Sequence, residues 1–225
     1  DDVETRDNGL LRLPANNFYW WGIDSDFRKN VSGGLFLNIG GDRDGDFRSV
    51  SLNTRIRIKD NIEIRIQPRY SQSRGVSRWV ENVDNPADLT TQIPVFGKLD
   101  TDRFSVVTRA NITFTKDLSL QFYNQLFFAS GAYKSYKALT SPDTFGTLTP
   151  GLYTENPDFN SRSMNVNALF RWEYRPGSTL FLVWTQARSG SGIPGDAAFG
   201  RNLAGIFDAP SENVLLMKFN YWWNM

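Results

Sequence analysis

Apolar and polar residues alternate along several long stretches of the chain. The clearest case is the pair of segments 47–59 and 62–73, whose apolar residues share one parity on both sides of a tight turn. These residues are Val50, Leu52, Ile56, Ile58, Ile62, Ile64 and Ile66. Because successive residues of a strand point to opposite faces, alternation over ten or more positions predicts long strands with one apolar and one polar face.

The same period recurs and predicts nine strands. They cover residues 18–29, 34–41, 47–59, 62–73, 103–116, 118–128, 162–174, 179–187 and 212–223. No segment is predicted to form an amphipathic helix. Tight turns are expected at 30–33, 59–61, 116–117 and 175–178. A polar loop is expected at 41–46, and long loops at 71–102, 129–161 and 187–211.

Long strands with short turns on one rim and longer loops on the other are the plan of an outer-membrane barrel. A tilted span of the bilayer takes about 9–11 residues per strand. The fold class expected is therefore all-β, a transmembrane antiparallel β-barrel whose apolar parity faces lipid. Aromatic residues near the strand ends match interfacial girdles: Phe18, Tyr19, Trp20, Trp21, Tyr70, Phe128, Trp172, Tyr174, Trp184, Trp222 and Trp223. An antiparallel sheet with one wet face, as in a soluble lipocalin-like ligand-binding domain, is the alternative.

The polar parity is densely charged, which suits a barrel lumen better than a surface facing solvent. The residues expected to line the lumen are Arg55, Arg57, Glu63, Arg65, Arg69, Arg109, Arg171 and Glu173. Neighbours on one face of two adjacent strands lie within reach of each other. A cross-strand network is therefore expected among five of these residues: Arg55, Arg57, Glu63, Arg65 and Arg69.

The number of predicted strands indicates whether they could close a barrel by themselves. Nine strands would begin on the loop rim and end on the turn rim, whereas bacterial single-chain barrels have an even number. The preferred interpretation is that residues 16–225 are part of a larger barrel, preceded by an extracellular-side lead-in at 1–15. Other options are a hidden strand in 1–15, a partner protein that supplies the edge, and a parallel pairing of 18–29 with 212–223. The start at Asp1, without Met or a signal pattern, indicates a mature or trimmed chain.

Composition removes several classes of protein. The chain has 225 residues, with 25 Lys and Arg against 24 Asp and Glu, so no nucleic-acid footprint is expected. It has no His and no Cys, which excludes disulfides, thiolate nucleophiles and His-assisted triads. Its mean hydropathy is −0.42 and it has no apolar run long enough for a membrane helix. We expect no enzyme activity.

Three motifs offer further chemistry. Asp42, Asp44 and Asp46 alternate beside a glycine as in calcium loops, but the distal ligand of an EF-hand is missing. A charged hairpin loop is therefore preferred and no cofactor is expected, with calcium bound by these three aspartates as the alternative. Glu63 and Glu173 resemble a glycosidase pair, yet neighbouring arginines would lower the pKa of a general acid.

The third motif is the loop 131–160, which is rich in aromatic and hydroxyl residues. Its rings are Tyr133, Tyr136, Phe145, Tyr153 and Phe159. They suit stacking on sugars or docking a partner, and equally packing of the loop onto itself.

Two segments resemble a known family. Residues 169–178 (Leu-Phe-Arg-Trp-Glu-Tyr-Arg-Pro-Gly-Ser) with 183–186 (Val-Trp-Thr-Gln) resemble the last hairpin of the domain-of-unknown-function 5916 family, and 215–222 resembles its C-terminus. The resemblance implies an outer-membrane protein with a carbohydrate-binding-type sandwich upstream of a C-terminal barrel. It offers no catalytic residues.

The function expected is that of a porin-like pore or membrane anchor in the cell outer membrane. Such a protein would be linked to carbohydrate uptake or belong to a complex at the cell surface. The partners expected are the lipid bilayer and other outer-membrane or surface proteins.

Overall fold

The alternating segments form one antiparallel sheet, seen here in a computed structural model that describes residues 4–6 and 8–223. The sheet has ten strands: β1 (Asn17–Asp24), β2 (Val31–Asp42), β3 (Gly45–Lys59), β4 (Ile62–Asn85), β5 (Asp88–Thr115), β6 (Leu118–Ser141), β7 (Thr144–Thr147), β8 (Phe159–Arg175), β9 (Ser178–Ser191) and β10 (Ser211–Asn220). Nine follow one another as β1-β2-β3-β4-β5-β6-β8-β9-β10, and β7 pairs with β6. The all-β, antiparallel part of the prediction is confirmed.

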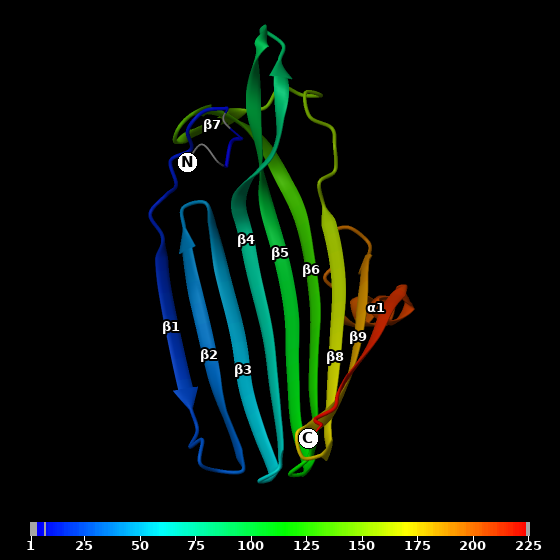
Figure 1. The fold of residues 1–225 in the computed structure, drawn as a ribbon. Coiled ribbons are helices and arrows are strands. Elements are labelled where there is room, and N and C mark those ends of the chain that lie inside the picture. Colours follow the sequence, from blue (N-terminus) through cyan, green and yellow to red (C-terminus); the bar gives the residue numbers. More distant parts are fainter. Residues whose placement is uncertain (1–3, 7, 224–225) are drawn as a thin grey trace.

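The sheet is open. Among the described residues β1 pairs only with β2, and β10 pairs only with β9. The two edge strands stand at opposite sides of the sheet and both descend toward the lower rim in Figure 1. A closed barrel is therefore not what these residues form, and the parallel pairing of segments 18–29 and 212–223 is absent from the described part of the chain.

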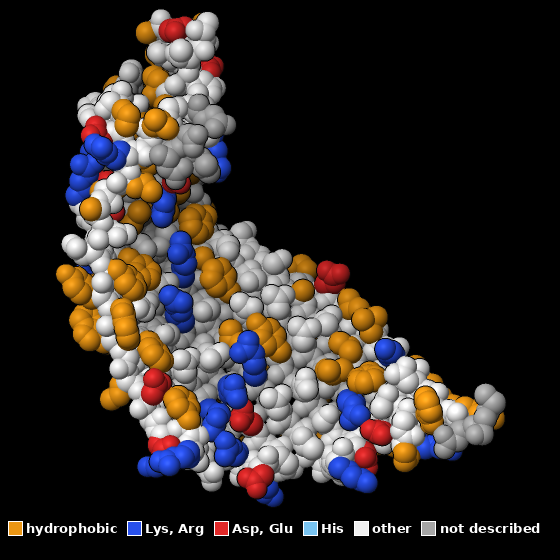
Figure 2. Space-filling model, turned by 60° about the vertical axis from the view of Figure 1, so that its left-hand side comes forward, with side chains coloured by type: hydrophobic (Ala, Val, Ile, Leu, Met, Phe, Trp, Pro, Cys, Tyr) orange, Lys and Arg blue, Asp and Glu red, His pale blue; other side chains and the backbone are white. Residues whose placement is uncertain are grey.

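The two faces of the sheet differ as the alternation predicts. One row of paired residues crosses six strands, from β1 to β6, on a single face: Trp21, Leu37, Val50, Tyr70, Phe104 and Phe128. We call this the apolar face, and the opposite parity, which contains Arg55, Arg65 and Arg109, the polar face. Figure 2 shows that the face with the gathered Lys and Arg side chains is hollowed.

The connections partly follow the prediction. Turns at 60–61, 116–117 and 176–177 lie at the lower rim in Figure 1, as expected for the predicted tight turns. The predicted turn at 30–33 is misplaced, because β2 already begins at Val31 and the connection covers 25–30. The predicted loop at 41–46 shrinks to residues 43–44.

The predicted loop 71–102 is wrong. Strands β4 and β5 extend through this region to a turn at 86–87, and their hairpin projects beyond the rest of the sheet (Figure 1). Register shifts between Ser73 and Val76 and between Trp79 and Glu81 interrupt the alternation, so the period that identifies a strand is lost there. The predicted loop 129–161 likewise holds the end of β6 and all of β7.

The predicted loop 187–211 contains a helix, α1 (Phe199–Asp208), although no helix was expected. It packs on the apolar face, where Ile206 is fully buried against Phe128, Met164 and Val166. Arg188 donates from Nη1 to the carbonyl oxygens of Phe207 and Ala209, at 2.7 and 2.8 Å. This places a cation at the negative end of the helix dipole.

No helix within the described residues reaches the length and hydrophobicity needed to cross a membrane.

Candidate functional site

The polar face brings three arginines from three strands into one row. Arg55 on β3 is directly opposite Arg65 on β4, and Arg65 is directly opposite Arg109 on β5. Directly opposed residues on one face have Cβ atoms about 4.5–5.5 Å apart, where like charges repel. The row therefore concentrates positive charge instead of neutralising it.

One carboxylate, from the next row of paired residues, reaches this row. Glu63 accepts a hydrogen bond from Nε of Arg65 at 2.7 Å, and its other oxygen is 4.0 Å from Nε of Arg55. The structure thus brings together Arg55, Glu63 and Arg65, three of the five residues from which a network was predicted, whereas Arg57 and Arg69 form no ion pair with them in the described structure. Arg57 is opposite Glu63 in the register, yet no ion pair joins the two in the described structure.

The arginines continue upward from the row. Arg69 and Arg103 line a hollow of about 320 Å³ together with the hydroxyl side chains of Ser71 and Ser105 and the ring of Phe47. Figure 2 shows Lys and Arg side chains following one another along the hollowed face. We call Arg57, Arg55, Arg65, Arg109, Arg69 and Arg103 the arginine file. Arg103 was not singled out from the sequence, although it shares the parity of Arg109.

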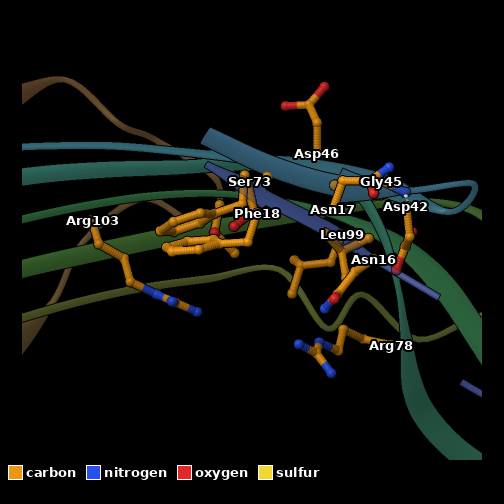
Figure 3. A pocket seen from close by; sticks show the side chains of 15 residues that line it. Asn16, Asn17, Phe18, Asp42, Gly45, Asp46, Ser73, Arg78, Leu99 and Arg103 are labelled. Carbon is orange, nitrogen blue, oxygen red and sulfur yellow. Dashed lines mark hydrogen bonds between the residues drawn. The ribbon is translucent and has the colours of Figure 1, made fainter. Parts of the chain in front are cut away.

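A second hollow, of about 350 Å³, lies at the upper end of the file between β1 and β5. Phe18 and Phe47 contribute rings, and Arg78 and Arg103 contribute charge. Figure 3 shows the two guanidinium groups on one side of the pocket, whereas the Asp46 carboxylate points to the other side. Asp42 also lines the pocket, which therefore combines aromatic faces and two cations with a carboxylate.

The remaining predicted lumen residues lie apart from the file. Arg171 and Glu173 are on β8 and form their own ion pair, with 2.8 Å between Nη2 and Oε2. Glu63 and Glu173 therefore belong to separate clusters, and each has an arginine as its partner. The structure gives no support to a carboxylate pair that acts in acid–base catalysis.

The three aspartates of the β2–β3 turn do not converge. Asp42 accepts the backbone N–H groups of Asp44 and Gly45, while Asp44 lies 3.4 Å from Nζ of Lys98. Asp46 lies 3.9 Å from Arg48. Within the described residues no group of three acidic side chains could hold a metal ion. The turn is a charged hairpin.

The aromatic residues of the predicted 131–160 loop pack against their surroundings. Tyr136 and Tyr153 have ring centroids 5.0 Å apart, and Phe145 meets Phe96 edge-on at 5.2 Å. Burial, with the neighbouring Tyr136 and Glu81, raises the pKa of Tyr153 to about 12. The Tyr136–Tyr153 contact agrees with packing of the loop onto itself, and the Phe145–Phe96 contact adds packing against β5.

A crevice that sequence reasoning missed lies between α1 and the apolar face. It has a volume of about 470 Å³ and is lined by Tyr70, Phe104, Phe128 and Phe199, with Asn202 at its polar side. The i, i+4, i+7 spacing of Phe199, Leu203 and Ile206 is the signal from which α1 could have been found.

Comparison with known proteins adds one result. No curated protein matches the chain, and no solved structure matches it. The model of a domain of unknown function, DUF5916, matches residues 1–225, and the chain therefore belongs to the DUF5916 family.

Proposed function

We propose that this chain forms part of a transmembrane β-barrel in the bacterial outer membrane, where it serves as a pore or membrane anchor. The observation that carries the proposal is the length of strand over which the apolar face stays apolar. On β4 every second residue from Ile62 to Tyr70 is apolar, a span of nine residues that ends before Gln72. A membrane-spanning strand needs about 9–11 residues.

On β3 to β6 the apolar stretch ends at one level. The row of opposed residues directly above Val50, Tyr70, Phe104 and Phe128 is polar and consists of Arg48, Gln72, Asp102 and Ser130. On β8 and β9 the change to Arg162 and Arg188 comes lower, opposite Phe128 and Met164. Strands β4, β5 and β6 continue well beyond this level. A sheet that packs a soluble core has no reason to stop its apolar face there, whereas a bilayer of fixed thickness supplies one.

Aromatic residues mark both ends of the apolar stretch. Tyr70, Phe104 and Phe128 are opposed at its upper end. At its lower end Trp172 meets Tyr174, and Tyr174 stacks on Phe219 with centroids 5.3 Å apart. Rings that span apolar and wet zones are typical of membrane interfaces.

The open edges are consistent with a barrel completed by further strands. β1 and β10 both point to the lower rim, so they would meet in parallel if the sheet simply closed (Figure 1). Unpaired backbone groups in lipid cost several kcal/mol each. In the proposed assembly, additional strands pair with both edges.

The proposal is tested with two single-cysteine variants of neighbouring residues, Ile64→Cys and Arg65→Cys, because the chain has no cysteine of its own. After folding into vesicles, a fluorophore at 64 should be quenched by brominated lipid and one at 65 by aqueous iodide. Identical quenching at both positions would contradict the assignment of the two faces. A chain that stays monodisperse without detergent would instead support a soluble, lipocalin-like domain.

A further inference from the structure

We propose that the arginine file binds and guides small solutes that carry phosphate, sulfate or carboxylate groups. The proposal deepens the proposed function, because it names the solute class that a pore of this kind would admit. Binding itself, however, requires only the polar face and not passage across a membrane.

The positive charge of the arginine file exceeds the negative charge of the carboxylates that contact it. It contains six arginines, and the carboxylate that reaches it is Glu63, which faces Arg55 and Arg65. Like charges placed directly opposite each other destabilise a sheet. The row Arg55–Arg65–Arg109 has two such contacts in succession. Bound anions would remove this repulsion.

Several donors of the file are unused. In the described structure the side chains of Arg57, Arg69 and Arg103 make no ion pair or hydrogen bond. Arg55 is held more tightly, because its Nη2 donates to the carbonyl oxygen of Phe27 and its Nε is enclosed. Arg109 has one long hydrogen bond, 3.4 Å to Oε1 of Gln67, and lies over the ring of Tyr123. The guanidinium groups of Arg57, Arg69 and Arg103 are therefore the donors that remain available to a ligand.

The spacing of the donors suits oxyanions. A guanidinium group presents a planar fork of N–H donors that matches the oxygens of carboxylate and phosphate groups. Two forks on directly opposed positions can contact one oxyanion from two sides. At Arg69 and Arg103 the hydroxyl groups of Ser71 and Ser105 line the same hollow and add neutral donors.

The extent of the file favours passage over a single closed site. It begins near the lower rim with Arg57 and ends at Arg103, which also lines the upper pocket. Rings of arginine and lysine are the elements that select anions in pores. Successive sites of moderate affinity allow a solute to move from one to the next.

The first test measures binding without transport. Protein folded in detergent is titrated with inorganic phosphate, and with chloride at equal ionic strength, while the thermal midpoint is recorded. We expect phosphate to raise the midpoint of the wild type. The double variant Arg65→Gln/Arg109→Gln should weaken the apparent phosphate affinity at least tenfold. Arg69→Gln serves as a second, milder variant if the double variant folds poorly.

The control removes one positive charge away from the file. Arg28→Gln lies in the 25–30 connection, where the Arg28 side chain is 92% exposed and paired with Asp26. Its phosphate response should equal that of the wild type. An equal loss in this variant, or no difference between phosphate and chloride in the wild type, would overturn the proposal.

The second test separates this inference from the proposed function. In planar bilayers, a salt gradient across the inserted protein should give a reversal potential that indicates anion preference, shifted toward cations in Arg65→Gln/Arg109→Gln. Insertion with cation preference would refute the anion path and leave the membrane assignment intact. Failure to insert, combined with phosphate binding in solution, would refute the membrane assignment and leave the anion site intact.

Discussion

Asn160 at the start of β8 and Asn202 in α1 are joined by a hydrogen bond of 2.9 Å, donated by Nδ2 of Asn160 to Oδ1 of Asn202. Both side chains are buried. The same Nδ2 also donates to the carbonyl oxygen of Asp196. This hydrogen bond connects the helix to the sheet between residues that are 42 positions apart in the sequence.

Loss of this bond should loosen the helix. In Asn202→Ala, Asn160 loses one of two acceptors while remaining buried, which costs about 1–3 kcal/mol. Trypsin cleavage after Arg201 should then accelerate at least fivefold, because about 1 kcal/mol corresponds to that ratio of populations. The control is Asn16→Ala, whose side chain is exposed. An unchanged cleavage rate in Asn202→Ala would show that the bond does not anchor α1.

The attachment of α1 should also depend on pH through Asp196. The Ala198 amide donates to this carboxylate, and this bond, with the nearby Arg201, holds the pKa of Asp196 below its usual range although burial acts in the opposite direction. A lowered pKa stabilises the folded form fully above the ordinary carboxyl pKa of about 4, and the contribution is lost as the pH falls through the folded pKa.

A nitroxide at Ala204→Cys would report this effect. Its spectrum should show increasing mobility as the pH is lowered from 6 to 3. In Asp196→Asn the mobility should be higher at pH 6, and the two proteins should become more alike as the pH falls through the lowered pKa of Asp196. A wild-type spectrum that does not change over this range would contradict the role of Asp196.

A charge on the apolar face should prevent insertion. Ile64 is opposed by Ile56 and Ala110 in the middle of the apolar stretch. In the proposed membrane setting Ile64→Arg should cost about 2–4 kcal/mol. Folding yield into vesicles, read from the shift in electrophoretic mobility on heating, measures this cost. The matched control Asn111→Arg adds the same side chain on the polar face, directly opposite Glu63, and should fold as well as the wild type.

Replacement of two glycines by alanine should change the stability of the protein in opposite directions. Gly177 in the β8–β9 turn has φ +77, and an added Cβ would lie 3.0 Å from Cβ of Trp222. Gly177→Ala should therefore destabilise the protein by about 1–2 kcal/mol. Gly200 in α1 has open space around it, so Gly200→Ala should be neutral or stabilise α1 by up to about 1 kcal/mol. Denaturant midpoints of the two variants on opposite sides of the wild type would confirm this contrast.

The part of the fold visible in the sequence is the part with an uninterrupted period of two. From Val50 to Tyr70 the chain alternates faithfully, and the predicted face of each side chain is the one that the register shows. Beyond Ser73 the bulges shift the parity, and polar residues occupy both faces, so the sequence pattern predicts a loop where the extended hairpin lies. The helix was missed because it is short and lies between residues typical of loops, such as Pro194 and Gly195.

The site was predictable to a similar degree. Strand parity alone places Arg55, Arg65 and Arg109 on one face, but it does not specify that the three are directly opposed, because the register also depends on the turns at 60–61 and 116–117. The hollow beside Phe47 depends on curvature of the sheet, which the sequence pattern does not encode.

The β4–β5 hairpin has a consequence for what the cell surface exposes. From Arg103 back to Asp88, β5 could reach about 50 Å beyond the apolar stretch at about 3.3 Å per residue. The headgroup layer is only about 5–8 Å thick on each side of the hydrocarbon core. In the proposed membrane orientation the tip at Pro86 and Ala87 would stand far above the lipid, as the first part of this chain that an approaching antibody or phage touches.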